Sequence, residues 1–129
     1  MNLVFERAFG VEQEVEELVR VLGWDYIIPG QVRCVYSCHS SSRAIARIWS
    51  TPRIFSFAFG TNPLYVIELI KRKYDSLSFD DKKKVLIHEL MHIPKTFSGA
   101  LKPHVNMKKH LCKTVDNEYS RYLSLKNNV

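Results

Sequence analysis

The chain has 129 residues, of which 46% are hydrophobic and 25% charged, and its formal net charge is +6. This length and composition exclude a largely disordered chain and leave little room for two domains, so we expect one globular domain over residues 1–129. No apolar stretch approaches the roughly 20 residues that span a bilayer, which predicts a soluble protein without membrane contact.

The N-terminal region has the pattern of an amphipathic helix. Apolar residues recur at three- and four-residue steps over residues 11–22, with glutamates between them, so one face is apolar and the other is charged. Gly23 marks the end of this helix. Pro29 and Gly30 then give a turn signal, and residues 32–36 predict a strand of β-branched and aromatic residues.

The middle of the chain predicts further strands. Residues 43–59 are apolar enough for a helix or for strands, and we favour two short strands because Pro52 interrupts the run. Residues 61–63, Thr-Asn-Pro, are a turn signal. Residues 64–70 are a clearer strand candidate, because they are almost entirely apolar and rich in β-branched side chains.

A second helix is predicted to begin after Ser78. Its hydroxyl can cap the first turn, and Asp80 and Asp81 favour the positive end of the helix dipole. The helix is expected to end near Ile93, because Pro94 disfavours helical geometry in the residue before it.

The C-terminal part predicts a loop followed by a last helix. Residues 96–103 are expected to be the loop, with Gly99 permitting an unusual backbone angle. Residues 105–123 carry apolar side chains at helical spacing and predict the helix. Residues 126–129 are expected to fray.

The most informative segment is His88-Glu89-Leu90-Met91-His92 inside the second predicted helix. Two histidines four residues apart project from one face of a helix, close enough to share a metal ion, and neutral imidazoles suit Zn²⁺. Glu89, next to the first ligand, can take the proton of a metal-activated water. This pattern predicts a zinc-dependent peptidase with Glu89 as general base.

A catalytic zinc site usually has three protein ligands. His104 is our first choice for the third, because the segment after His92 is long enough to reverse direction and return an imidazole over the helix. Three later residues compete with it, namely His110, Asp116 and Glu118, and of these Glu118 comes next after His104.

The segment from Leu86 to His104, LIHELMHIPKTFSGALKPH, resembles the core signature of the putative phage metallopeptidase family, which is similar in style to SprT-like zinc peptidases. Residues 65–70 and 74–78 resemble the family's approach to the active-site helix, and the likeness extends over residues 32–104. It implies an α+β, zincin-like minimal metallopeptidase fold, with a small mixed or antiparallel sheet packed against the HExxH helix. It also implies zinc ligands at His88, His92 and His104, and a base at Glu89.

In such peptidases a strand beside the active-site helix pairs with an extended substrate. The strand predicted at residues 64–69 is either that edge strand or an interior one. The expected partner is therefore a protein or peptide substrate.

The three cysteines, Cys34, Cys38 and Cys112, do not form a disulfide framework and indicate a reducing cytoplasm, which would be the host's if the protein is viral. Cys34, Cys38 and His39 could suggest a second metal site. On a strand, however, positions four apart lie roughly 13 Å apart. We therefore expect ordinary thiols.

The positive charge gathers in three clusters at residues 71–73, 82–84 and 108–109. Such clusters are more often a solvated face than a nucleic-acid site. They nevertheless motivate a rival interpretation, in which the same histidines hold a zinc ion that stabilises a non-catalytic binding protein with nucleic acid as a candidate partner.

Overall fold

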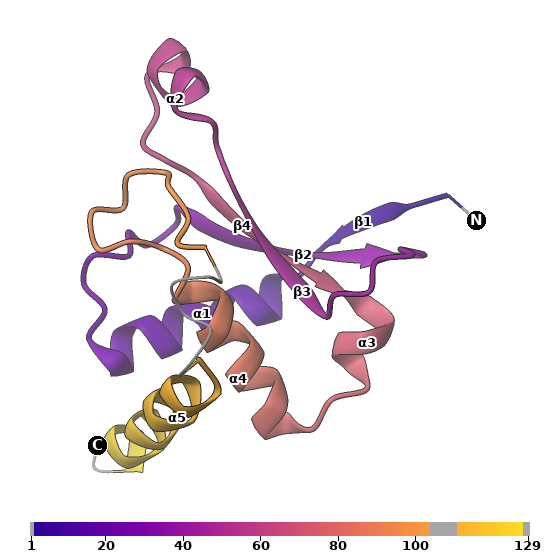
Figure 1. Cartoon of the computed structure of the whole chain (residues 1–129), viewed down its shortest axis with the longest axis vertical. Coiled ribbons are helices and arrows are strands. Elements are labelled where there is room, and N and C mark those ends of the chain that lie inside the picture. Colours follow the sequence, from indigo (N-terminus) through magenta and orange to yellow (C-terminus); the bar gives the residue numbers. More distant parts are fainter. Residues whose placement is uncertain (1, 104–110, 128–129) are drawn as a thin grey trace.

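The structure, a computed structural model, describes residues 2–103 and 111–127 and has the order strand, helix, two strands, helix, strand and three helices (Figure 1). The elements are β1 Val4–Arg7, α1 Phe9–Leu22, β2 Val32–Cys38, β3 Ala46–Ser50, α2 Arg53–Phe59, β4 Tyr65–Ile70, α3 Lys71–Asp75, α4 Phe79–Leu90 and α5 Leu111–Asn127. The fold class is α+β, as predicted.

The strands form one mixed sheet in the order β1-β2-β4-β3. β1 runs antiparallel to β2, β2 runs parallel to β4, and β3 runs antiparallel to β4. Ile67 of β4 lies between Cys34 of β2 and Ile48 of β3. The strand at residues 65–70 is therefore interior, and β3 and β1 form the two edges of the sheet.

The main core lies between one face of the sheet and the helices α1 and α4, which lie below it in Figure 1. Because side chains alternate along a strand, Tyr65, Ile67 and Leu69 of β4 all point into this core. The helices contribute Val11, Val15, Leu18, Leu22, Leu86, Ile87 and Leu90.

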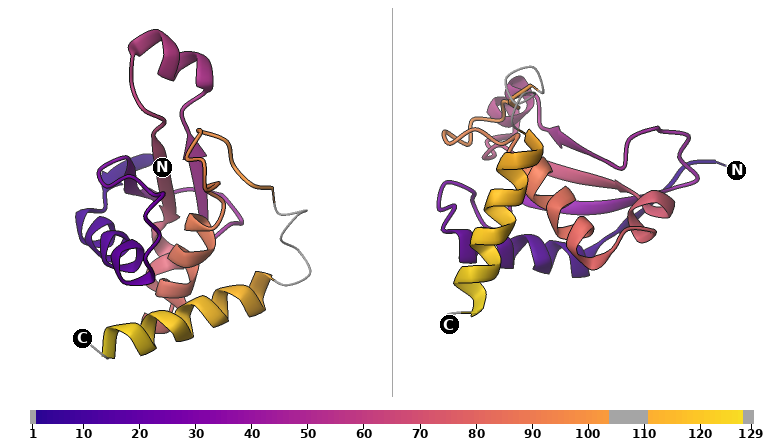
Figure 2. Two further views of the ribbon diagram at one scale, coloured as in Figure 1. Left: turned by 90° about the vertical axis from the view of Figure 1, so that its left-hand side faces the viewer. Right: turned by 60° about the horizontal axis from the view of Figure 1, so that its bottom comes forward.

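Helix α5 packs across α1 and α4, as the two views in Figure 2 show. Two tyrosine hydroxyls anchor it: Tyr119 donates to Asp80 at the start of α4, and Tyr122 donates to Glu17 of α1. The C-terminal helix thus holds together the two helices on which the sheet rests.

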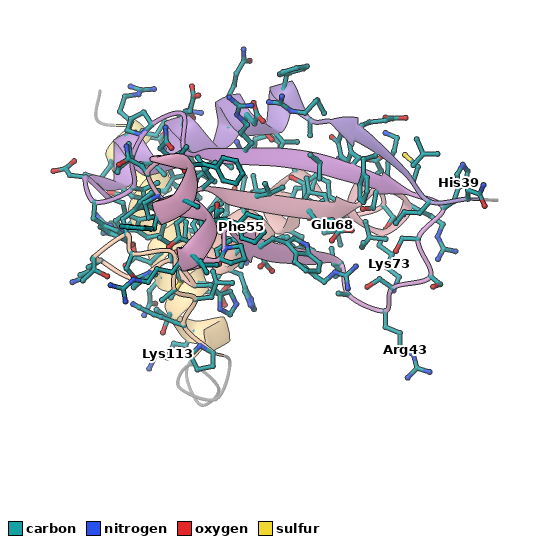
Figure 3. The ribbon with its side chains drawn as sticks, turned by 90° about the horizontal axis from the view of Figure 1, so that it is seen from above. His39, Arg43, Phe55, Glu68, Lys73 and Lys113 are labelled. Carbon is teal, nitrogen blue, oxygen red and sulfur yellow. The ribbon has the colours of Figure 1, made fainter. Side chains whose placement is uncertain are left out.

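The opposite face of the sheet carries a buried carboxylate, Glu68 of β4, labelled in Figure 3. Ser37 of β2 donates a hydrogen bond to it, while Trp49 Nε1 donates at 2.8 Å and Arg47 Nε at 3.2 Å from β3. Burial raises the pKa of Glu68, but these donors outweigh it and hold the pKa below its usual value. Glu68 therefore ties the edge strand β3 to the centre of the sheet.

The prediction of two short strands within residues 43–59 is right for β3 and wrong for α2. Pro52, which precedes α2, provides the carbonyl oxygen that accepts from Phe55 N–H at 2.9 Å, and Gly60 ends the helix with φ of 64°. These local bonds, with Phe55 stacked on Phe59 one turn later, favour a helix over the strand that the aromatic residues suggest.

The remaining predictions differ mainly at their boundaries. The helix over residues 11–22 is confirmed and begins earlier, at Phe9; β2 runs on to Cys38. β1 and α3 were not predicted. The last helix continues to Asn127, and the residues before Leu111 at which it was expected to begin lie outside the described part. In the described residues, no helix is long and apolar enough to cross a bilayer.

Candidate metal centre and active site

Helix α4 presents the first two residues of the motif. Ser78 caps it as predicted, its hydroxyl accepting from Asp81 N–H at 3.1 Å. Leu86, Ile87 and Leu90 are fully buried against the sheet and the other helices. This packing fixes the rotation of α4 about its axis and so the direction in which His88 and Glu89 project.

The predicted end of the helix near Ile93 is wrong, because α4 ends at Leu90. His92 N–H donates to the Glu89 carbonyl at 3.1 Å, and Ile93 N–H donates to the Leu90 carbonyl at 3.0 Å. These are three-residue bonds, which tighten the chain beyond the last helical turn. Pro94 lacks the N–H that would continue the helical ladder.

Despite this tightening, His88 and His92 lie side by side, with ring centroids 5.2 Å apart and ring planes tilted by 43°. His88 is half-buried and His92 is only 4% exposed. The prediction that their four-residue spacing brings the two imidazoles together is confirmed. What differs is that a tightened turn, rather than the helix itself, carries the second ring.

The ring of His92 is oriented by the backbone of Lys102. Its Nδ1 lies 2.5 Å from the Lys102 carbonyl oxygen, and Lys102 N–H donates to the His92 carbonyl oxygen at 2.7 Å. Because a carbonyl oxygen only accepts, Nδ1 carries the proton and Nε2 presents the lone pair. This is the arrangement by which proteins orient a metal-binding histidine.

Glu89 points into the site and is 7% exposed. Burial raises the pKa of its carboxyl group to about 7. A carboxyl group with a pKa near neutrality can both take and return a proton at physiological pH, as general acid–base catalysis requires.

These three side chains line a cavity of about 750 Å³. The edge strand β3 and the residues before it, residues 43–48, form its opposite wall, while Val85 and residues 101–103 also contribute. Sequence reasoning did not single out β3 or Lys102, since their role depends on contacts between segments far apart in the chain.

The loop between His92 and Lys102 is held in place by Tyr65 of β4. The Tyr65 hydroxyl accepts from Gly99 N–H at 2.8 Å and donates to the Ala100 carbonyl oxygen at 3.1 Å. Its ring meets Phe97 edge-on at a centroid distance of 4.9 Å. This anchoring delivers Lys102 to His92.

The third ligand stays a prediction. His104 and His110 lie outside the described residues. Asp116 pairs with Lys84 at 3.1 Å, and Glu118 accepts from Arg121 at 2.8 Å. Residues 2–103 and 111–127 contain no group of three histidine, cysteine or carboxylate side chains that could hold a metal.

The cysteines agree with the expectation of ordinary thiols where the structure describes them. Cys34 and Cys38 both lie on β2 and are free, and Cys34 is fully buried in the core. Burial raises the pKa of the Cys34 thiol to about 12, which keeps it protonated.

The comparison with protein families completes this description. A family model described as putative phage metallopeptidase matches residues 4–122, nearly the whole chain. The chain belongs to the putative phage metallopeptidase family. The match includes α1 and most of α5, which the sequence resemblance did not cover. No curated protein and no solved structure is matched.

Proposed function

We propose that this member of the family is a zinc-dependent peptidase of zincin-like fold, with Glu89 as general base. The observation that carries the proposal is the placing of a buried carboxylate beside two adjacent imidazoles, on the wall of a cavity whose other wall is a sheet edge. The family's description as a metallopeptidase supports the same chemistry.

Two of the described side chains, His88 and His92, are suited to be ligands of a zinc ion. The bond from His92 Nδ1 to Lys102 directs Nε2 to a metal, and neutral imidazoles suit Zn²⁺. We propose His104 as the third ligand. Lys102 is paired to His92, and His104 follows two residues later in the chain.

In the proposed reaction, zinc when bound supplies Lewis-acid activation of water and of the substrate carbonyl. Glu89 takes the proton of the attacking water and passes it to the leaving amine. The raised pKa of Glu89 supports both transfers.

The substrate is proposed to be an extended segment of a protein or peptide. β3 is an edge strand of the sheet and lines the cavity opposite Glu89. A peptide added to this edge would form main-chain hydrogen bonds with β3 and pass in front of the site.

The rival, a non-catalytic protein that binds nucleic acid, gains little from the described lysines. Lys71 pairs with Asp75, Lys73 donates to the Ser42 carbonyl oxygen, Lys83 pairs with Glu14, and Lys84 pairs with Asp116. Residues 108 and 109 lie outside the described part. Lys73, Lys83 and Lys84 thus join separate segments of the chain, while Lys71 pairs within α3.

The first test is the metal content of protein purified without chelators. We expect one zinc per chain, weakened or lost in His92→Ala and in His104→Ala. Loss of zinc in His92→Ala but not in His104→Ala would mean that the third ligand is another residue. A metal-free parent with an unchanged fold would contradict the metal centre.

The second test uses a peptide library with product detection by mass spectrometry. Cleavage by the parent and its loss in Glu89→Gln, with zinc retained, would support the mechanism. A Glu89→Gln variant that cleaves as fast as the parent would contradict this mechanism.

A further inference from the structure

Helix α2 projects from the sheet on the side away from α1, α4 and α5 (Figures 1 and 2). None of its residues is buried. Phe57 is 87% exposed and Phe59 74%, and Ile54 and Phe55 are exposed as well. A helix whose large apolar side chains meet water on its outer surface indicates an interaction site.

The apolar side chains form one continuous surface. At about 100° per residue, the five apolar positions of α2 cover about 200° of its circumference, with Ala58 at the middle of the arc. Arg53 and Ser56 occupy the remainder. We call this arc, made of Ile54, Phe55, Phe57, Ala58 and Phe59, the α2 surface.

The helix does not draw its stability from the core of its own chain. A helix of seven residues is marginal in water, and most helices in proteins are stabilised by packing one face. Here the ends are satisfied by local bonds, with Pro52 before the helix and Gly60 after it. Packing of the α2 surface against a partner would supply the missing stabilisation.

The base of this projection is fixed. Thr51 N–H donates to the Leu64 carbonyl oxygen at 2.9 Å, and Leu64 N–H donates to Thr51 Oγ1 at 3.1 Å. A Cβ atom added to Gly99 would lie 3.5 Å from the Pro63 side chain and 3.5 Å from the Thr51 carbonyl oxygen. The loop that carries Lys102 therefore rests against this base. The α2 surface is therefore held in one direction, which lowers the entropic cost of binding.

We propose that the α2 surface is the contact through which two copies of this chain form a reversible two-fold dimer. Charge supports a second copy. Residues 50–64 contain one charged residue, Arg53, in a chain of net charge +6. Two like-charged copies meet here with little repulsion, whereas an anionic lipid surface would be attracted by a basic cluster that this segment lacks.

The available area also fits a dimer. At roughly 200 Å² per aromatic side chain, the exposed parts of the three phenylalanines amount to about 400 Å². Ile54 and the residues at the rim add to this area. The total for one copy then approaches the smaller of the standard interfaces, in which each partner contributes roughly 800 Å². An interface of this size gives a dimer that dissociates on dilution.

In a two-fold contact the same patch meets itself. Ala58 is small and central, so the two copies of Ala58 lie nearest the axis, with Phe55 and Phe59 on one side and Phe57 on the other. None of the described residues that line the cavity belongs to α2, so the dimer and the proposed peptidase can be tested separately.

The experiment is sedimentation equilibrium of the full chain from about 5 to about 500 µM, since mass action makes dimerisation depend on concentration. We expect a monomer–dimer equilibrium, with a dissociation constant raised by about tenfold or more in Phe57→Ser/Phe59→Ser. Phe79→Ser, which removes a phenylalanine of similar exposure at the start of α4, is the matched control and leaves the equilibrium unchanged.

A second measurement tests the geometry directly. Under mild oxidation Ala58→Cys is expected to form a covalent dimer that neither the parent nor the control Ser120→Cys, on the exposed face of α5, forms. A monomer at every concentration overturns the proposal. So does growth beyond dimers, or an equilibrium unaffected by the paired substitution. Binding of the monomer to anionic phospholipid vesicles through Phe57 and Phe59 would assign the surface to a membrane instead.

Discussion

The backbone of Lys102 makes two hydrogen bonds with His92: its carbonyl oxygen orients the imidazole through Nδ1, and its N–H donates to the His92 carbonyl oxygen. The loop between them returns the chain to the side of the cavity that His92 lines. The imidazole that is proposed to bind zinc is thus positioned by a residue ten positions away, whose side chain takes no part.

Lys102→Pro should weaken zinc binding. The substitution removes the N–H that donates to the His92 carbonyl oxygen and loosens the carbonyl that orients the ring. We expect the zinc affinity to fall by about 10- to 100-fold, the range seen when the partner of a ligating histidine is lost. Competition with a chromogenic chelator measures this. Lys102→Ala keeps both backbone bonds and should bind zinc like the parent; equal loss in both variants would contradict the backbone role.

Tyr65→Phe should destabilise the fold. It keeps the ring against Phe97 but removes the hydroxyl that bonds both Gly99 N–H and the Ala100 carbonyl oxygen. Leaving these groups without a partner in a half-buried place costs about 1–3 kcal/mol. Urea unfolding of the metal-free protein measures the loss. An unchanged midpoint would show that the loop is held without Tyr65.

Glu89→Gln should stabilise the metal-free protein at high pH. The folded carboxyl has a pKa of about 7 and the unfolded one about 4.5, so folding binds a proton between these values. As the pH rises through this window the charged group becomes a growing cost, on the order of 3 kcal/mol above pH 7. Glutamine does not ionise and escapes this cost.

The measurement compares the free energies of unfolding of parent and Glu89→Gln at pH 5 and pH 8, both in the presence of a chelator. The advantage of the variant should be larger at pH 8. A difference that is the same at both pH values would show that Glu89 titrates in the folded protein as it does in water.

Glu68→Gln should loosen the edge strand that faces the cavity. The neutral amide is a weaker acceptor for Ser37, Trp49 and Arg47, and we expect a loss of about 2 kcal/mol of stability. Because the pKa of Glu68 is lowered by these donors, the parent should lose this contribution as the pH falls below the usual range of a carboxyl group, while the variant should not.

Hydrogen exchange locates this effect. Amides of β3 should exchange faster in Glu68→Gln, with smaller changes in β1, which Glu68 does not contact. Uniform acceleration across the sheet would mean that Glu68 supports the whole fold rather than the edge strand.

The sequence by itself determined the parts that depend on neighbouring residues. Helices α1 and α4 follow from apolar residues spaced by three and four, the Ser78 cap from one side chain and one nearby amide, and the meeting of His88 and His92 from their spacing. Each of these rests on interactions within a few residues, which a linear pattern records.

Only the tertiary structure decided that β4 is interior while β3 is an edge strand, and what orients His92. The strand order β1-β2-β4-β3, the Lys102 carbonyl at His92 and the four-residue cluster around Glu68 join segments that are ten or more residues apart. Hydrophobic patterns do not specify such pairings, because many partners satisfy the same pattern. For α2 the local aromatic residues favoured a strand, and hydrogen bonds at its two ends decided for a helix.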